Sequence, residues 1–295
     1  MSSRALDHAG RPQLSPIYMW AGGKGRLLRS YAPLWPAREG YDRYVEPFFG
    51  AGAVYAWMKN AHPSLPTSLG DVNAELVVML RALAASPAAF IAAVADLVDD
   101  YLATPATARK AWYYALRSCY WDAPSSPVLF VLMRLSFNGI WQTCVASGGL
   151  FGTPAGLLGH KRADQVAGGQ QLYAWAGALA DTYIHAGSYD TLPFDPSRAL
   201  VYLDPPYRGS FTSYGTGFDD ADQVALATWY RRMVAGGARV LLANRCVSGD
   251  TFFEDLLGDI ATFHYFNVTY TAGRRKVTAA GFAAMPAREF LAISR

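Results

Sequence analysis

An apolar run, Ala199–Leu203, ends abruptly at Asp204-Pro205-Pro206-Tyr207. Each proline fixes its own φ angle and has no N–H group to donate to a sheet. The chain must therefore leave a buried strand here, on a rigid turn that holds an acidic acceptor close to an aromatic ring. This combination suits a planar substrate with an exocyclic amino group, which the carboxylate and a backbone carbonyl could bind while the ring stacks on it. The alternative is an ordinary strand end with a turn-forming aspartate and a packed tyrosine.

Two predicted strands near the start of the chain are separated by a glycine-containing turn and a helix. Residues 44–45 and 67–70 have the composition of short strands, and residues 53–60 that of a helix. An acidic residue, Asp71, ends the second strand. A strand, loop, helix and second strand in this order form the first half of a doubly wound, Rossmann-like α/β sheet, which is the fold class that we predict.

The turn at residues 46–52 and Asp71 together favour an adenosine-containing cofactor. Gly50 and Gly52 permit close backbone approach to a ligand, and a helix N-terminus follows them. Asp71 follows Gly52 by 19 residues, close to the about 20 residues expected for an acid that binds a ribose. Such an acid argues against a 2′-phosphate. The alternatives are a structural glycine turn and an aspartate that caps the next helix.

Residues 81–181 have a different pattern from the rest of the chain. Apolar residues recur there every three or four positions, which predicts helices without core strands. The predicted helices are 87–102, 108–120 and 126–135. We therefore expect an inserted, mainly helical domain at 81–181 within a core formed by 16–80 and 182–295, after a flexible tail at 1–15.

The second half of the core has further alternating elements. Strands are predicted at 182–185, 199–203 and 240–243, and a helix at 219–234. Residues 261–268 and 289–293 can close the sheet as an antiparallel pair joined by a basic, flexible loop.

Two further segments have a functional and a structural interpretation. Trp20-Ala21-Gly22-Gly23-Lys24 could fold over a ligand, with Lys24 pairing a carboxylate, or could be a loop with a buried tryptophan and an exposed lysine. Phe137-Asn138-Gly139 could place an aromatic wedge in a duplex. Alternatively, Phe137 completes the apolar face of the preceding helix.

Composition and charge narrow the classes of protein. The formal charge of +3 permits binding to a polyanion without requiring it, although basic residues cluster locally, as at Lys161-Arg162 and Arg274-Arg275-Lys276. Isolated cysteines without metal-ligand spacing argue against a metal site and a disulfide framework. The most apolar stretch, 76–98, is interrupted by charged residues and a proline, so we expect no membrane span, no secretory signal and a cytoplasmic location.

Taken together and in this order, the motifs resemble those of the DNA adenine methylase (Dam) family of N6-adenine methyltransferases. The residues from Met19 to Lys24 resemble the family's opening motif, and those from Val45 to Gly52 its cofactor loop. Residues 70–73 are similar to its ribose-binding strand end, 137–139 to its DNA-contact segment and 187–189 to a short motif before the catalytic strand. Residues 204–207 are similar to its catalytic tetrapeptide. The resemblance covers residues 17–293.

The resemblance implies S-adenosylmethionine as methyl donor and assigns residues to it. Trp20, Ala21 and Lys24 would line the cofactor site, with Lys24 near the methionine end. Residues that would approach the cofactor from the strand ends are Pro47, Phe48, Gly50, Asp71, Val72 and Asp204, with Ser188 and Tyr189 completing the pocket.

The resemblance further implies double-stranded DNA as substrate and catalysis at Asp204, Pro205, Pro206 and Tyr207. Asp204 and the Pro205 carbonyl would accept the two N–H bonds of adenine N6, and the base would be flipped out of the duplex to stack on Tyr207. The expected DNA-binding residues are Phe137, Asn138, Gly139, Gln142, Arg274, Arg275 and Lys276. Basic loops around Lys24, Lys161 and Arg274 would hold phosphates.

Two departures from the family bear on the recognition sequence. Met19 stands where the opening motif usually begins with a lysine, and GATC-reading members carry an arginine where this chain has residues 140–143, among them Gln142. Because arginine is the preferred reader of guanine and glutamine suits adenine, we expect a target other than GATC.

The chemistry at Asp204 also permits other functions. These are an amino-methyltransferase acting on cytosine N4, RNA or a protein amide, and a non-catalytic cofactor-binding DNA protein. We find no nuclease motif, so a restriction endonuclease partner would be a separate chain, and an orphan bacterial or phage-borne enzyme is equally compatible.

Overall fold

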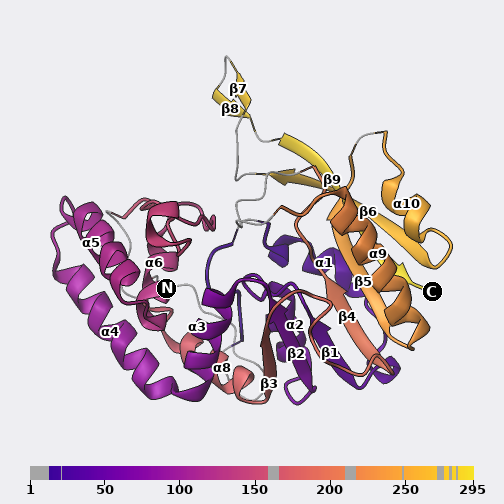
Figure 1. The fold of residues 1–295 in the computed structure, drawn as a ribbon, viewed down its shortest axis with the longest axis horizontal. Helices are drawn as coiled ribbons and strands as arrows, with labels where there is room; N and C mark the ends of the chain where they lie inside the picture. Colours follow the sequence, from indigo (N-terminus) through magenta and orange to yellow (C-terminus); the bar gives the residue numbers. More distant parts are fainter. Residues whose placement is uncertain are drawn as a thin grey trace.

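The computed structural model describes residues 13–20, 22–158, 166–209, 217–247, 249–270, 276–278, 281–283 and 285–295. Their main feature is a seven-stranded sheet in the order β3-β2-β1-β4-β5-β9-β6 (Figure 1). The strands are β1 Arg43–Glu46, β2 Thr67–Asp71, β3 Thr182–Ala186, β4 Ala199–Leu203, β5 Arg239–Arg245, β6 Ala261–Tyr270 and β9 Met285–Ser294. The first five are parallel to one another, and β9 pairs antiparallel with both β5 and β6. The predicted Rossmann-like sheet with an antiparallel closing pair is confirmed.

The register of the parallel strands brings the site together. Val45 of β1 lies opposite both Ser68 of β2 and Val201 of β4. Because parallel strands end at the same edge of a sheet, the residues at their carboxyl ends, Glu46, Asp71 and Asp204, lie along that edge.

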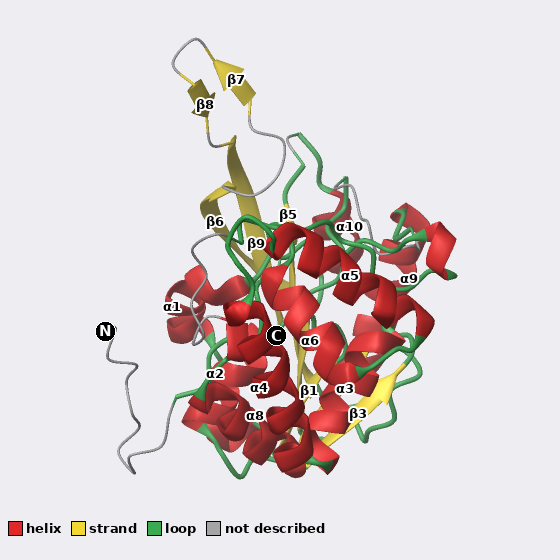
Figure 2. Ribbon diagram, turned by 90° about the vertical axis from the view of Figure 1, so that its left-hand side faces the viewer, coloured by secondary structure: helices red, strands yellow, loops and turns green. Residues whose placement is uncertain are grey.

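Helices cover both faces of the sheet (Figures 1 and 2). Successive side chains of a strand point to opposite faces, so a strand that is buried at every position, such as β4, needs helices on both. On one face Tyr44, Leu200 and Tyr202 pack in one apolar cluster with α2 (Ala53–Ala61), α3 (Ala74–Ala85) and α8 (Gln170–Ala180). On the other face Val45 and Val201 pack against α9 (Asp220–Ala235) and α10 (Phe252–Leu257). The short elements are η1 Lys24–Arg26, α1 Leu28–Tyr31, η2 Ala32–Leu34, η3 Arg38–Gly40 and η4 Val145–Ser147.

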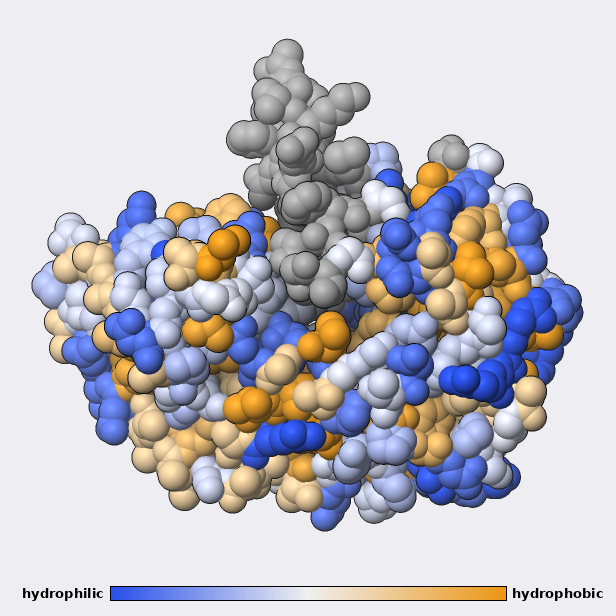
Figure 3. Space-filling view, viewed as in Figure 1, coloured by the Kyte–Doolittle hydropathy of each residue, from blue (hydrophilic) through white to orange (hydrophobic). Residues whose placement is uncertain are grey.

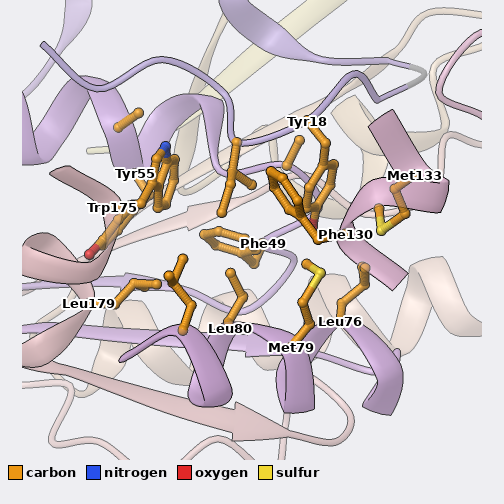
Figure 4. Packing of buried hydrophobic residues seen from close by; sticks show 14 of the residues in the cluster. Tyr18, Phe49, Tyr55, Leu76, Met79, Leu80, Phe130, Met133, Trp175 and Leu179 are labelled. Atoms are coloured by element: carbon orange, nitrogen blue, oxygen red, sulfur yellow. The ribbon is translucent and has the colours of Figure 1, made fainter. Parts of the chain in front are cut away.

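The helical region contains α4 (Pro87–Ala103), α5 (Arg109–Asp122) and α6 (Ser126–Leu135), close to the predicted bounds. A further helix, α8, was not predicted. Figure 4 shows Phe130 and Met133 of α6 converging with Leu76 and Met79 of α3. One cluster therefore connects the helical region to the sheet, and its division from the core at residues 81 and 181 stays a prediction.

The predicted absence of a membrane span concerns α3 and α4. No single helix in the described ranges is both long and apolar enough to cross a bilayer, although α3 and α4 would pass together by length and composition across a 114° bend. On the face seen in Figure 3, hydrophilic and hydrophobic residues are interspersed over both halves of the molecule.

The expectation of a flexible loop between the last two strands is wrong in its extent. β6 and β9 pair as far as Tyr270 and Met285, and a two-stranded hairpin, β7 (Lys276–Thr278) with β8 (Gly281–Ala283), lies between them. Residues 269–288 contain glycines, alanines and a basic cluster, and this composition predicted a loop rather than strands. Figure 2 shows this hairpin standing beyond the ends of β6 and β9.

Gly52 begins α2 in a left-handed conformation, with φ of 67°, and a Cβ there would lie 2.6 Å from Phe49 and 2.7 Å from Trp175. We expect Gly52→Ala to lower the free energy of unfolding by about 2–4 kcal/mol, from backbone strain and overpacking together. Gly148→Ala is a matched control, because φ is 71° and nothing lies within 4 Å. It should cost about 1 kcal/mol, and equal losses in denaturant titrations would contradict the packing argument.

Candidate active site

Lys24 and Asp204 form a buried ion pair at the carboxyl edge of the sheet. Asp204 directly follows β4, and Lys24 lies in η1, with 2.7 Å between Lys24 Nζ and Asp204 Oδ1. The Lys24 side chain is 4% exposed and that of Asp204 21% exposed. Nζ also donates to the Gly22 carbonyl at 3.0 Å and lies 4.7 Å from the centre of the Tyr207 ring. The interpretation of Lys24 as an exposed lysine is therefore wrong, and its ammonium group is directed at Asp204 rather than at DNA phosphates.

Burial shifts the ionisation of two carboxyl groups beside this pair. It raises the pKa of Asp204 to about 6, against the opposing effect of Lys24. It raises the pKa of Glu46 to about 8, although Tyr44 Oη donates to Glu46 Oε2 at 2.7 Å. The pKa of Asp204 is therefore raised less than that of Glu46, so Asp204 is the carboxyl group of the two that ionises more readily.

Glu289 holds the hydroxyl group of Tyr207. Tyr207 Oη donates to Glu289 Oε2 at 2.6 Å, and Glu289 is buried in β9. No sequence motif predicted this residue. The signal that could have found it is a carboxylate directly before the apolar run of residues 290–293, since an acid buried at a strand end needs a donor.

Asp71 fastens the glycine turn to the end of β2. Its Oδ2 accepts the Gly50 N–H at 3.0 Å and its Oδ1 accepts the Asn73 N–H at 2.9 Å. Burial raises its pKa to about 6, opposed by these two donors. The cap of α3 is Asn73, whose Oδ1 accepts the Leu76 N–H at 3.3 Å, so the alternative in which Asp71 caps that helix is wrong.

Apolar groups surround the Asp71 turn. Val72 is 60% exposed beside it. A Cβ at Gly50 would lie 3.1 Å from Trp20 Nε1, which places the Trp20 ring against the turn. The rings of Phe48 and Tyr189 are stacked with centroids 5.4 Å apart.

The segment before β4 also reaches this turn. The Gly187 N–H donates to the Asp71 carbonyl at 3.0 Å, which brings the exposed Ser188 and then Tyr189 to it. Pro47 is buried under the strand ends, and Ala21 lies outside the described residues. The partly exposed Asp71 carboxylate and the backbone of the Gly50 turn fit a ribose, and the apolar surface beside them fits the purine of an adenosine-containing group.

The Phe137-Asn138-Gly139 segment lies against the opening motif. Phe137 follows α6 and is 46% exposed, which argues against the alternative in which it completes that helix's apolar face. Asn138 and Gly139 have φ of 54° and 62°. A Cβ at Gly139 would lie 2.4 Å from the Met19 carbonyl oxygen, so only glycine fits there.

The remaining predicted DNA contacts are only partly described. Gln142 is exposed, and Lys276 lies in β7. Arg274 and Arg275 lie outside the described residues, as do Lys161 and Arg162. Within the described ranges no group of His, Cys, Asp and Glu side chains could hold a metal ion.

Comparison with known proteins settles the family. Residues 20–274 match the model of the D12 class of N6 adenine-specific DNA methyltransferases. The chain belongs to this family. The resemblance inferred from the motifs is thereby confirmed, and the match spans both Lys24 and Asp204.

Curated relatives are similar along most of their length. The chain is 26% identical to type II methyltransferase M.MjaIII of Methanocaldococcus jannaschii over 91% of this chain and 94% of the relative. It is 27% identical to the retron Ec67 DNA adenine methylase of Escherichia coli, over 95% and 92%. It is 31% identical to a DNA adenine methylase of Vibrio cholerae, over 76% and 79%.

Replacing Lys24 tests the electrostatics of the site. We expect Lys24→Met to raise the pKa of Asp204 further, because its charged form loses the nearest cation while burial still opposes ionisation. A carbon-13 NMR titration of the carboxyl groups would measure it, with Asp204→Asn used for assignment. Lys59→Met is the control, since Lys59 is also buried but donates to the Leu65 carbonyl at 3.0 Å. An unchanged Asp204 titration in Lys24→Met would contradict the pairing.

Proposed function

We propose that this member of the family transfers a methyl group from S-adenosylmethionine to adenine N6 at specific sites in duplex DNA, by base flipping and direct in-line transfer. The observation that carries the proposal is Asp204, paired with Lys24 beside the Tyr207 ring, at the sheet edge that also holds the Asp71 turn. The name DNA adenine methylase of two relatives supports the same substrate.

The residues around Asp71 would hold the methyl donor. Bound there, S-adenosylmethionine supplies an electrophilic methyl group on a sulfonium centre. Asp71 would accept the ribose hydroxyl groups, and Val72 and Phe48 offer apolar surface to the purine. Trp20 and Gly50 would approach from one side and Ser188 with Tyr189 from the other.

Asp204 acts on the nucleophile as an orienting acceptor. The N6 lone pair of adenine is delocalised into the ring, which makes this amine a weak nucleophile. Lys24 binds Oδ1 of Asp204, so Oδ2 and the Pro205 carbonyl would accept the two N–H bonds and favour a pyramidal nitrogen. The lone pair is then directed at the methyl group, and acceptors stand where positive charge develops.

Tyr207 and Phe137 would serve the extrahelical base. Flipping costs a few kcal/mol, and stacking on an aromatic side chain returns about 1–3 kcal/mol. Phe137 is exposed at the turn after α6 and could fill the gap that the base leaves. Gln142, exposed in the same segment, carries the proposed preference for a target other than GATC.

A product assay tests the reaction. The protein is incubated with labelled S-adenosylmethionine and mixed duplex DNA, and the DNA is digested to nucleosides. We expect label in N6-methyladenine alone, and sequencing of modified positions would give the site. Label in N4-methylcytosine or only in RNA would refute the adenine assignment, and tight DNA binding without label would favour a non-catalytic protein.

Asp204→Ala should abolish measurable transfer while leaving cofactor binding largely intact. Loss of one preorganised electrostatic group costs about 10²–10³ in turnover, and the second acceptor cannot orient N6 by itself. Calorimetric titration with S-adenosylmethionine checks the binding. Retained turnover would contradict the assigned role.

The turnover number should fall as the pH drops below about 6. Burial places the pKa of Asp204 at about 6, and protonation below that value removes the acceptor, so the rate declines on the acid side and is flat above it. In Lys24→Met the acid limb should move to higher pH, because the Asp204 pKa rises. Rate profiles under saturating substrates measure both, and an acid limb that stays in place would count against Asp204 as its origin.

A further inference from the structure

Two fully buried amide side chains hold the turn that carries Tyr207. Gln223 of α9 and Asn244 of β5 are both 0% exposed. Gln223 Nε2 donates to the Pro206 carbonyl at 2.8 Å, and Asn244 Oδ1 accepts the Arg208 N–H at 3.2 Å. The two amides also bind each other, since Asn244 Nδ2 donates to Gln223 Oε1 at 3.3 Å.

These bonds fix the backbone on both sides of one residue. The Pro206 carbonyl belongs to the peptide group before Tyr207, and the Arg208 N–H to the peptide group after it. Because a peptide group is planar, holding one polar atom of each restricts the two dihedral angles of Tyr207. The direction of its Cα–Cβ bond is thereby set.

The amides themselves have little freedom to move. Asn244 Oδ1 accepts a second N–H, from Arg245 at 2.8 Å. A buried amide that rotated out of place would leave donors and acceptors unsatisfied, each at an energetic cost. The pair is therefore a rigid support that connects α9 and β5 to the turn.

We infer that Gln223 and Asn244 are positioning residues that hold the Tyr207 ring in the orientation on which a flipped adenine stacks. This inference rests on the proposed role of Tyr207 in the methyl transfer. Glu289 holds the hydroxyl end of the same ring from β9, so the ring is fixed at its backbone by two elements and at its tip by a third.

The side chain of Arg208, the residue after Tyr207, is held by a separate set of contacts. Arg208 pairs with Asp220 at 2.7 Å and with Asp250, and its guanidinium lies 4.1 Å from the centre of the Phe252 ring. These contacts anchor the Arg208 side chain on the surface. They do not hold the peptide groups next to Tyr207, which depend on the two amides.

The test is Gln223→Met, which keeps the side-chain length and removes both hydrogen bonds. Single-turnover methyl transfer to plasmid DNA should slow by about 10²-fold, the effect of a small misplacement of reacting groups. The dissociation constant for S-adenosylmethionine should stay within about twofold, since the cofactor residues do not contact Gln223. Gln223→Glu retains a donor and an acceptor while burial keeps its carboxyl group protonated, so it should recover most of the rate.

Gln171→Met is the matched control. Gln171 is a buried glutamine of another helix, α8, and its Nε2 also donates to a backbone carbonyl, that of Gln13, at 2.6 Å. Its replacement should lower the melting temperature by a similar amount and leave the transfer rate near that of the unsubstituted protein.

A second readout follows the base itself. The probe is a duplex in which 2-aminopurine replaces the adenine that the protein methylates. Stacking on Tyr207 quenches the fluorescence of this base, so we expect Gln223→Met to give brighter emission than the unsubstituted protein at saturating enzyme. The inference is overturned if folded Gln223→Met transfers at the normal rate, or if Gln171→Met slows transfer equally. If the unsubstituted protein methylates no adenine, the proposed function fails instead, and that measurement comes first.

Discussion

Two consecutive prolines deprive the turn after β4 of backbone donors, and the site is built around that lack. Pro205 and Pro206 have no N–H groups, so neither residue can contribute a backbone donor to the turn. Side chains from other elements hold it instead. Lys24 pairs with Asp204, Gln223 holds the Pro206 carbonyl and Glu289 holds the Tyr207 hydroxyl group. The turn is rigid because its partners come from rigid elements on both sides of β4.

Burial of three carboxyl groups at the same edge of the sheet has an electrostatic cost. Burial disfavours the charged forms of Asp204, Glu46 and Asp71, and each has a raised pKa. A buried ion pair is weak evidence of stabilisation, since desolvation offsets most of the attraction. The arrangement is better understood as one in which Lys24 favours ionisation of Asp204, while burial raises the pKa of Glu46 further. Perturbed carboxyl groups concentrated in one place are typical of functional sites.

Local patterns predicted the sheet and the glycine turn, and long-range contacts were beyond their reach. The strand at residues 199–203 and its exit at Asp204 follow from apolar composition and proline chemistry, which act within a few residues. The partners Lys24 and Glu289 lie 180 and 85 residues away from Asp204 along the chain, so only the closed sheet shows them to be neighbours. Helix α8 was missed because Gly168 and Gly169 precede it and extend the glycine-rich composition of the loop.

Residues 19–24 contact three parts of the chain that lie far apart in sequence. The Met19 carbonyl lies against Gly139 in the proposed DNA-contact segment, and the Trp20 ring lies against Gly50 in the proposed cofactor turn. Lys24, four residues later, reaches Asp204. Each contact tolerates little change, since a Cβ at Gly139 would overlap the main chain and an uncharged residue at 24 would leave Asp204 without its cation. This segment therefore fixes the turn at Gly139, the Gly50 turn and the Asp204 carboxylate relative to one another.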